Sequence, residues 1–505
     1  MGLAILLSRA QIGVEAPPVT IEVFLSGGLP KFNVVGLAAT AVRESKDRVR
    51  AAILSSDFSF PQQRITVNLG PADMKKTGGR FDLAIALGIL AAGRQIPHKV
   101  FDVFEFYGEL ALNGELRAVP GVLPAAIKAA RAGRSLLVPS ENGPEAALAG
   151  GDVFSARSLL EVTALLRDSR NAEPVLPPEI KKSAASGPDL ADVRGQQFAK
   201  RAIEVAAAGA HNILFIGPPG TGKSMLAQRL PRLLPTMDNE EAIETAAVDS
   251  VLGRPIDART LHVRPFRSPH HTASAVALVG GGSEPRPGEI SRAHNGVLFL
   301  DELAEFSRHV LEVLREPVES GRITISRASG QADYPARFQL VAAMNPCPCG
   351  YYGDVQGDCR CSADVVQRYR GKISGPLLDR IDIHIEVNRP PVALLRPDAP
   401  KGEASASVAR RVAAARAIQV ARSGKANAAL GAAELAEVFR AEQNCLALLE
   451  QASEKLSLSA RAYQRIQRVA RTIADLAGED TVSRGHMAEA LSLRQLDRVR
   501  RQTLD

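Results

Sequence analysis

Residues 217–224 read Gly-Pro-Pro-Gly-Thr-Gly-Lys-Ser, which is a complete phosphate-binding loop. An apolar run at 212–216 precedes the loop, and residues 225–234 have helical spacing. A glycine-rich turn between a strand and a helix directs backbone N–H groups at a polyphosphate, so a chance glycine turn is the weaker interpretation. Lys223 is expected to reach the β- and γ-phosphates, and the Ser224 hydroxyl to ligate Mg²⁺. The residues predicted to bind ATP are Gly217, Pro218, Pro219, Gly220, Thr221, Gly222, Lys223 and Ser224.

Two carboxylates, Asp301 and Glu302, follow an apolar run at 296–300. Such a run fits a buried parallel strand, which delivers its last residues to the catalytic edge of a sheet. Asp301 is then expected to bind the Mg²⁺ of the nucleotide together with Ser224, and Glu302 to polarise the attacking water. Without the phosphate loop, an Asp-Glu pair in this position is often no more than a strand end.

A second apolar run at 340–344 ends at Asn345. Its side chain is predicted to orient the lytic water or to touch the γ-phosphate; the alternative is a turn-forming Asn before Pro346. Farther on, Arg461 stands at the start of a helix that is expected to run to Ala477. Arg461 is predicted to reach the nucleotide from a helical lid.

Arg380 lies between two acids, Asp379 and Asp382, beside an apolar segment. An exposed guanidinium in this setting can stabilise transition-state charge on the γ-phosphate held by a neighbouring subunit. The alternative is a local ion pair with Asp379 or Asp382, which contributes under about 1 kcal/mol when it is exposed.

Four of the five cysteines form two Cys-x-Cys pairs, Cys347 with Cys349 and Cys359 with Cys361. Four thiolates that converge across a short hairpin can bind a tetrahedral Zn²⁺. Reduced thiols without metal, or a redox pair, are the alternatives. Cys445 stands alone in a helical segment and is predicted to be a core residue.

The elements that must position these residues fall into three blocks and a linker. Residues 1–166 alternate β-like runs, at 19–25 and 64–69, with helical patterns, at 41–54 and 81–92, which predicts a compact α/β domain. The polar, proline-rich stretch 167–189 is expected to be a linker. Residues 190–390 hold the phosphate loop and spaced apolar runs, which predict a parallel sheet with helices on both faces. Residues 391–505 are rich in alanine and arginine and predict a helical domain.

The composition is typical of a soluble protein, since 45% of the 505 residues are hydrophobic and 23% are charged. No apolar run reaches the roughly 20 residues of a membrane-spanning helix. The first ten residues are too weakly apolar for a signal peptide, so the sequence predicts a cytoplasmic protein. A net charge of +7 permits a polyanionic partner without requiring one.

The order of the phosphate loop, the acidic pair, Asn345, Arg380 and Arg461 is typical of AAA+ ATPases. The surrounding sequence is more specific and resembles the YifB/ComM family of magnesium-chelatase-like AAA+ ATPases over almost the whole chain. The stretches that carry the resemblance include Gly-Leu-Ala at 36–38, Thr-Gly-Gly-Arg-Phe-Asp-Leu-Ala at 77–84, Arg-Pro-Phe-Arg-Ser-Pro-His-His-Thr-Ala-Ser at 264–274, Leu-Val-Gly-Gly-Gly at 278–282 and Pro-Gly-Glu-Ile-Ser at 287–291.

The resemblance implies an N-terminal Lon-protease-like α/β domain (ribosomal S5 domain 2-like), an AAA+ module with a helix-2 insertion, and a C-terminal helical lid. It also implies a homohexameric motor that drives branch migration of DNA in natural transformation and grips branched or single-stranded DNA with loops around a central pore. Residues 323–330 look like one such hairpin. Arg327, near its tip, is predicted to contact a DNA phosphate, with a solvated turn arginine as the alternative. His270 and His271 are expected to serve a pore loop or hydrogen bonds rather than a metal.

A Lon-like domain raises the question of proteolysis, which needs a serine activated by a lysine. No serine occurs between Ser59 and Ser135, the region in which this fold would place the nucleophile. Thr77 is a conceivable substitute, but residues 75–82 are better explained as a basic surface loop that contacts DNA or is simply solvated.

Two other functions stay open. One is a chelatase-type motor that powers metal insertion into a tetrapyrrole, and the other is a protein-remodelling ATPase or adaptor without DNA translocation. The chain's own N-terminal domain and basic tail favour the DNA motor over the chelatase.

Overall fold

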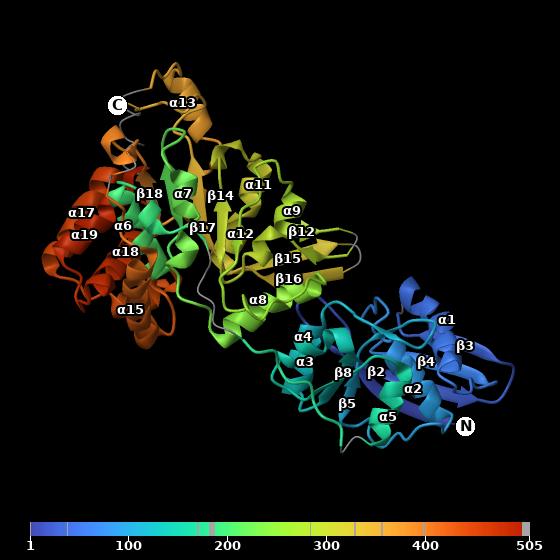
Figure 1. Ribbon diagram of the computed structural model, residues 1–505. Coiled ribbons are helices and arrows are strands. Elements are labelled where there is room, and N and C mark those ends of the chain that lie inside the picture. Colours follow the sequence, from blue (N-terminus) through green and yellow to red (C-terminus); the bar gives the residue numbers. More distant parts are fainter. Residues whose placement is uncertain are drawn as a thin grey trace.

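The computed structural model describes residues 2–496 except 38, 169–170, 181–186, 283, 328–329, 355–356, 397 and 399. An N-terminal α/β part, a central sheet that carries the phosphate loop and a helical C-terminal part follow one another along the chain (Figure 1). The predicted mixed α/β fold class is therefore confirmed. The domain boundaries at 166, 189 and 390 stay predictions.

The N-terminal part is built on a seven-stranded sheet with the order β3-β4-β2-β1-β5-β8-β9. β2 pairs antiparallel with β1 and β4, and the other neighbours are parallel. Residues alternate between buried and less buried along β4, as expected of a strand with one covered face. The strands are β1 (Gly2–Arg9), β2 (Pro18–Ser26), β3 (Lys31–Val35), β4 (Arg64–Gly70), β5 (Phe104–Phe106), β8 (Ser135–Pro139) and β9 (Val153–Ala156).

The helices of this part cover the sheet. α2 is buried along its whole length and packs on β1 and β2, which explains its uniformly apolar sequence. The predicted strands at 19–25 and 64–69 and the predicted helices at 41–54 and 81–92 are all present within a few residues. The helices are α1 (Thr40–Ser55), α2 (Asp82–Ala92), α3 (Val122–Arg131), α4 (Gly143–Ala147) and α5 (Leu159–Arg167).

The loop before α2 is not the basic surface that the sequence predicts. Lys76 is fully buried and its Nζ donates to the carbonyl oxygen of Pro71. Arg80 is also buried, donates to the hydroxyl of Tyr107 and lies over that ring. Lys75 is exposed. Two of the three cations thus hold local structure, because a buried charge needs hydrogen-bond partners. The partner of Arg80 lies 27 residues away and could not be predicted from the sequence.

The central sheet consists of five parallel strands in the order β11-β14-β17-β10-β18. β10, β14 and β17 are buried along their whole length, which accounts for their uninterrupted apolar sequences. Because the strands are parallel, we call the edge at which they all end the carboxyl edge and the opposite one the amino edge. The strands are β10 (Ile213–Ile216), β11 (Phe266–Arg267), β14 (Val297–Leu300), β17 (Gln339–Met344) and β18 (Ile383–Glu386).

The helix after the phosphate loop is shorter than the sequence predicts. α7 covers Lys223–Ala227 and is followed by a separate 3₁₀ turn at Leu230–Arg232, instead of one helix over 225–234. Pro231 lies in that turn, and a proline lacks the N–H that a continuing α-helix needs. The other helices around this sheet are α6 (Gln197–Gly209), α8 (Asn239–Val251), α9 (Ala275–Val279), α10 (Glu289–Arg292), α11 (Arg308–Val313), α12 (Arg315–Ser320), α13 (Ala363–Arg370) and α14 (Gly375–Leu378).

Two β-hairpins project beside the central sheet. The first is β12 (Gly280–Gly281) with β13 (Arg286–Pro287), and the second is β15 (Arg322–Arg327) with β16 (Gly330–Pro335). β12 contacts β15, and the hydroxyl of Tyr334 donates to the carbonyl oxygen of Pro285 at 2.7 Å, so the hairpins lie side by side.

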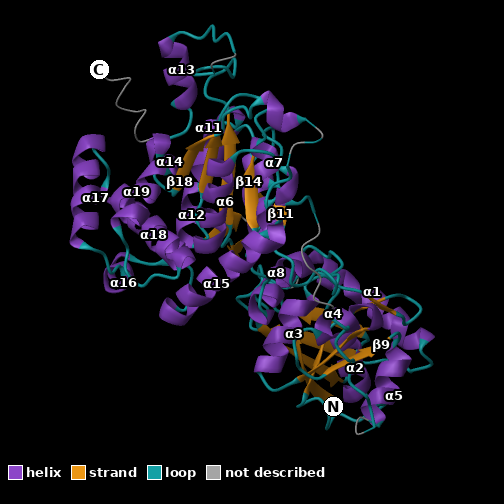
Figure 2. Cartoon of the chain, turned by 60° about the vertical axis from the view of Figure 1, so that its left-hand side comes forward, coloured by secondary structure: helices purple, strands orange, loops and turns teal. Residues whose placement is uncertain are grey.

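The N-terminal part docks on α8, and both ribbon views place α3 next to it (Figures 1 and 2). Leu123 packs with Ala242 and Ala246 of α8 in one small apolar cluster. The backbone N–H of Gly121 donates to the carbonyl oxygen of Ser250 at 2.8 Å, and that of Leu123 to the Ser250 hydroxyl at 3.2 Å. The two parts are therefore joined by packing as well as by the chain between them.

The C-terminal part is helical, as predicted. α15 and α18 pack on α6, and Cys445 is fully buried among apolar side chains, which confirms its predicted core position. Among the described residues, no helix combines the length and the apolar character required to cross a bilayer. The helices are α15 (Ser405–Ser423), α16 (Ala432–Val438), α17 (Gln443–Leu456), α18 (Ala460–Ala477) and α19 (Arg484–Ser492).

Candidate functional site

The phosphate loop joins β10 to α7 at the carboxyl edge. Gly220 and Gly222 have φ angles of 77° and 91°, in the left-handed region that glycine adopts without strain. Gly217 has no room for a side chain, because a Cβ there would lie 2.2 Å from the carbonyl oxygen of Val387. The loop therefore needs glycine at all three positions, which suits a backbone that curls closely around phosphate groups.

Lys223 lies buried beneath this loop. Its Nζ donates to the carbonyl oxygens of Gly217 and Pro218 at 2.7 and 2.9 Å and to Oδ1 of Asn345 at 3.2 Å. Burial lowers the pKa of Lys223, while the charge of the nearby Asp301 acts in the opposite direction. A buried ammonium held by neutral oxygens is well placed to gain from an anionic ligand such as a polyphosphate.

Ser224 and Asp301 contact each other directly. The Ser224 hydroxyl donates to Oδ2 of Asp301 at 2.5 Å, and Asp301 directly follows β14. A hydroxyl and a carboxylate side by side are the oxygen donors that Mg²⁺ takes in nucleotide sites. The two residues that the sequence predicts as Mg²⁺ ligands therefore fit that ion.

Glu302, the predicted base, is held by a histidine. Its backbone has a φ of 53°, a left-handed conformation that is uncommon for a residue other than glycine and is concentrated at functional sites. Its side chain is 53% exposed, and Oε2 lies 2.9 Å from Nδ1 of His271. The ring of His271 in turn lies 4.2 Å from that of His270, centroid to centroid. One member of the histidine pair, His271, thus contacts the Glu302 carboxylate that is predicted to polarise water, in agreement with the expected hydrogen-bonding role.

Asn345 completes the group at the carboxyl edge. It follows β17 directly, and its side chain accepts the hydrogen bond from Lys223 described above. The structure therefore brings Lys223, Ser224, Asp301 and Asn345 together, with Glu302 next to Asp301, as the order of the motifs predicts.

The four clustered cysteines converge next to this group. The Sγ atom of Cys347 lies 3.3 Å from that of Cys349 and 3.8 Å from that of Cys359, and the Sγ atoms of all four lie within 4.8 Å of one another. Four sulfurs around one Zn²⁺ at about 2.3 Å would be about 3.8 Å apart, so the spacing fits a tetrahedral site. Cys361 is the fourth member.

The cysteine loop also contacts the phosphate loop. Gly350 has a φ of 88°, and a Cβ at this position would lie 2.8 Å from Cδ of Pro219 and 3.9 Å from Cγ of Asn345. The segment between the two cysteine pairs is thus packed against the nucleotide-binding backbone.

Arg380 lies at the amino edge, away from the phosphate loop of its own chain. It comes just before β18, and β18 runs parallel to β10 with Ile383 opposite Ile213. The side chain is buried: Nη1 donates to the carbonyl oxygen of Pro376 at 2.8 Å and Nη2 pairs with Glu319. The expectation of an exposed guanidinium is therefore wrong.

The alternative predicted for Arg380, a local ion pair with Asp379 or Asp382, is also wrong, because among the described residues its carboxylate partner is Glu319. Asp382 is fully buried and pairs instead with Arg465, while its Oδ2 accepts from the backbone N–H of Asn212 at 2.9 Å. Burial acts to raise the pKa of Asp382, but its interactions with Arg465 and His211 together outweigh burial and hold that pKa well below its usual range. Asp382, two residues after Arg380, thus pairs with another arginine.

Arg461 lies beside Arg380 rather than beside the nucleotide site of the same chain. Its Nη2 is 3.8 Å from Oε1 of Glu319, the residue that also holds Arg380. The predicted contact between Arg461 and a nucleotide bound to its own phosphate loop is therefore not supported by this arrangement.

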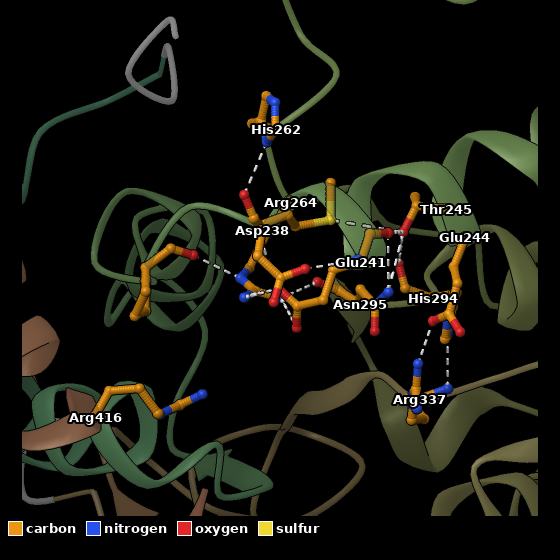
Figure 3. A network of polar contacts seen from close by, with 12 residues as sticks. Asp238, Glu241, Glu244, Thr245, His262, Arg264, His294, Asn295, Arg337 and Arg416 are labelled. Atoms are coloured by element: carbon orange, nitrogen blue, oxygen red, sulfur yellow. Dashed lines mark hydrogen bonds and ion pairs between the residues drawn. The ribbon is translucent and has the colours of Figure 1, made fainter. Parts of the chain in front are cut away.

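A polar network ties α8 to the amino edge (Figure 3). Arg264 donates to the carboxylate of Glu241 at 2.7 Å and to the carbonyl oxygen of Asn295 at 2.7 Å, just before β14. Glu244 contacts both His294 and Arg337, the latter two residues before β17. The helix that carries the N-terminal part is thus fixed to the starts of the two strands that end at Asp301 and Asn345.

Arg327 ends β15 and is exposed. Its Nη1 donates to the carbonyl oxygen of Ser326 at 2.9 Å, and a Cβ on Gly281 would lie 2.5 Å from its Nη2. Its guanidinium therefore rests over the neighbouring hairpin, near a tip whose residues 328–329 lie outside the described part of the chain.

Two residues that hold these sites in place, Glu319 and Gln196, could not be predicted from the sequence. Glu319 stands in an ordinary helical stretch, and nothing in the sequence links it to Arg380 or Arg461. Gln196 donates to the carbonyl oxygens of Thr221 and Asn388, and so fixes the phosphate loop to the segment after β18. Both contacts depend on folding that brings distant segments together.

Comparison with known proteins decides the family. Three models cover most of the chain: "Subunit ChlI of Mg-chelatase" at residues 21–142, "Magnesium chelatase, subunit ChlI" at 189–394 and "Magnesium chelatase, subunit ChlI C-terminal" at 402–494. The competence protein ComM of Haemophilus influenzae is 50% identical over 505 residues, which cover 99% of each chain. The chain belongs to the YifB/ComM family of magnesium-chelatase-like proteins.

Other relatives agree with this membership. The YifB protein of Salmonella typhimurium is 49% identical over 501 residues, which cover 99% of this chain and 98% of that one. The magnesium-chelatase 38 kDa subunit of Cereibacter sphaeroides is 28% identical over 218 residues, 39% of this chain and 57% of the subunit. With the phosphate loop and the acidic pair in place, this YifB/ComM protein is an AAA+ ATPase that uses ATP and Mg²⁺.

Proposed function

We propose that this AAA+ ATPase is a ring-shaped, homohexameric motor that moves branched or single-stranded DNA, as in branch migration during natural transformation and recombination. The observation that carries the proposal is the similarity over 99% of both chains to a protein named as a competence protein. The phosphate loop with its acidic pair supplies the ATP-driven step, and DNA is the polyanion on which such a motor would act.

Within this proposal the residues at the carboxyl edge perform hydrolysis. Lys223 binds the β- and γ-phosphates, and Ser224 and Asp301 hold Mg²⁺, which supplies charge neutralisation of the phosphates when it is bound. The Glu302 carboxylate accepts a hydrogen bond from the attacking water and so polarises it, and Asn345 orients that water. His271 holds the Glu302 carboxylate before the water is in place.

A neighbouring chain completes the site. Arg380 and Arg461 lie at the amino edge, where no phosphate loop of the same chain can meet them. A ring in which the amino edge of one chain faces the carboxyl edge of the next brings both arginines to the neighbour's γ-phosphate, where they stabilise transition-state charge. The ATPase then works only as an oligomer.

Arg327 is the proposed DNA contact. Its exposed guanidinium at the end of a projecting hairpin can reach a phosphate of a strand in a central pore, and such contacts give affinity without sequence preference. We further propose that Cys347, Cys349, Cys359 and Cys361 hold one Zn²⁺ that braces the loop beside the phosphate site.

The rival functions are a chelatase-type motor and a protein-remodelling ATPase without DNA translocation. The chelatase relative aligns with only 39% of the chain, which favours the DNA motor for the whole protein. The rivals share the ATPase chemistry and differ from the motor in having no response to DNA.

The test is branch migration of a synthetic three-strand junction, with the Lys223→Ala variant as the inactive control. ATP turnover is measured in parallel with and without forked DNA at two salt concentrations. We expect migration that depends on Lys223 and a stimulation of turnover that falls steeply with salt, because phosphate contacts release counterions. Active ATPase without migration and without any response to nucleic acid would favour the remodelling ATPase.

A matched pair of arginines tests the DNA contact. Arg322 begins the strand that Arg327 ends, and both are exposed. Arg327→Ala is expected to weaken DNA binding and to reduce the salt slope by about one, whereas Arg322→Ala leaves both near the parent values. Equal effects of the two substitutions would remove Arg327 from the proposal.

A further inference from the structure

Glu319 joins two arginines that come from separate parts of the chain. It lies near the end of α12, and its two carboxylate oxygens divide between two partners: Oε2 pairs with Arg380 before β18, and Oε1 lies 3.8 Å from Arg461 at the start of α18. One carboxylate thus links the central sheet to the C-terminal helices at the amino edge.

The contacts of Arg380 leave its guanidinium little capacity for another ligand. Nη1 donates to the carbonyl oxygen of Pro376, Nη2 pairs with Glu319, and Nε is buried with no hydrogen-bond partner among the described residues. The side chain of Arg380 is 9% exposed, whereas that of Glu319 is 52% exposed. An incoming phosphate can reach Arg380 in a fork-like, bidentate manner only by taking the place of the Glu319 carboxylate.

The space in front of these residues allows such an exchange. A depression of about 440 Å³ is lined by Glu312, Arg315, Glu316, Glu319, Ser320 and Arg380. Glu319 is the outer, solvated member of its ion pair with Arg380, so it can turn into solvent while the buried arginine stays near its place. A phosphate oxygen and a carboxylate oxygen make the same kind of charge-assisted contact with a guanidinium.

We propose that Glu319 is a positioning residue that occupies Arg380 and Arg461 until the γ-phosphate bound to a neighbouring chain displaces it. The inference rests on the proposed function, because it assumes that the two arginines act on the neighbour's nucleotide. Glu319 then suppresses ATP turnover at an interface where Arg380 and Arg461 do not yet contact the ATP bound to the neighbouring chain. Because the same carboxylate releases both arginines, the C-terminal helices and the central sheet respond together.

The test compares ATP turnover without DNA in four variants of the full chain: Glu319→Gln, Glu316→Gln, Arg380→Ala and the double variant Glu319→Gln/Arg380→Ala. Glu316 is the control, an exposed acid of the same helix that lines the same depression. We expect Glu319→Gln to raise kcat about three- to five-fold with little change in KM, because the substrate is bound by the neighbour's phosphate loop. Glu316→Gln should match the parent, and the double variant should match Arg380→Ala.

The outcomes separate this inference from the function on which it rests. If Arg380→Ala is inactive but Glu319→Gln turns over ATP no faster than Glu316→Gln, the inference fails and the shared site stands. A rate increase that persists in the double variant also overturns the inference, because Glu319 would then act without Arg380. If Arg380→Ala keeps the parent rate, the shared site itself is wrong and the inference falls with it. As a control, the midpoint temperature of thermal unfolding is measured for Glu319→Gln and the parent. Equal midpoints show that a change in rate is not caused by lost stability.

Discussion

The carboxyl and amino edges of the central sheet carry polar groups of different kinds. At the carboxyl edge, Lys223 contacts Asn345 and Ser224 contacts Asp301, so the side chains needed to bind a nucleotide meet within one chain. At the amino edge, Arg380 and Arg461 contact only an acid of the same chain among the described carboxylates. β10 separates the edges by four residues, or about 13 Å at roughly 3.3 Å per residue.

This difference indicates how the ATPase is assembled. One folded chain contains a complete nucleotide-binding group and a separate pair of arginines that it cannot use on its own nucleotide. Under the proposed function, the two halves act together when two chains meet edge to edge. Substitutions at the carboxyl edge should therefore affect the chain that carries them, and those at the amino edge should affect its neighbour.

The largest expected effect lies at the carboxyl edge. Glu302→Gln should lower ATP turnover at least about 100-fold, because the amide cannot polarise the attacking water, while ATP still binds through Lys223 and Ser224. Phosphate release and binding of a fluorescent ATP analogue measure the two effects. Glu305→Gln, an exposed acid in the following 3₁₀ turn, is the matched control and should keep the parent rate. Undiminished turnover in Glu302→Gln would show that another group activates the water.

The four-cysteine cluster beside this edge, proposed to hold Zn²⁺, makes an all-or-none prediction. Elemental analysis should find about one Zn²⁺ per chain in the parent and in Cys445→Ser, and essentially none in Cys359→Ser, because a tetrahedral site needs all four thiolates. Cys445 is fully buried far from the cluster in sequence and controls for the loss of any one thiol. A parent protein without bound metal would leave the four cysteines as reduced thiols.

A smaller effect should distinguish two glycines of the same cysteine loop. Gly350 and Gly353 both have positive φ, at 88° and 79°. A Cβ at Gly350 would meet Pro219 at 2.8 Å, whereas a Cβ at Gly353 would meet no atom of the described residues within 4 Å. Both alanine substitutions strain the backbone by about 1 kcal/mol, so the difference between them reports the contact with the phosphate loop. We expect the Kd for ATP to rise about three- to ten-fold in Gly350→Ala and little in Gly353→Ala, as measured by titration with a fluorescent analogue. Equal affinities would mean that the cysteine loop does not support the phosphate loop.

The sequence predicts the carboxyl edge better than the amino edge, and the physical reason is the same for each residue. Ser224, Asp301 and Asn345 each stand next to an apolar run, and parallel strands deliver such residues to one edge without any further information. The partner of Arg380 could not be predicted in this way, because Glu319 is 61 residues away in a helix with no distinguishing pattern. Local acids were only the alternative partners predicted for Arg380, and one of them, Asp382, pairs with Arg465 instead.

In the N-terminal part, too, the sequence predicts the elements better than the contacts between distant side chains. Its strands and helices follow from alternation and helical spacing, whereas the burial of Lys76 and Arg80 does not. A run of cations with glycines is typical of a surface loop, and only the fold brings the Pro71 carbonyl and the Tyr107 hydroxyl within reach of them. The contact between Glu302 and His271 could be predicted in part. The sequence indicates a hydrogen-bonding role for the histidine pair, but only the structure shows that the partner is Glu302.

The claim that one edge binds the nucleotide and the other supplies arginines to a neighbouring chain is tested most directly by mixing two inactive variants. Lys223→Ala lacks the carboxyl-edge group and Arg380→Ala lacks the amino-edge group, so each alone should have little turnover. In random rings of equal parts, about a quarter of the interfaces pair an intact phosphate loop with an intact arginine. If the two edges act across an interface, ATP turnover in the mixture rises toward about a quarter of the parent rate. Turnover that stays at the mean of the two separate variants would contradict that claim.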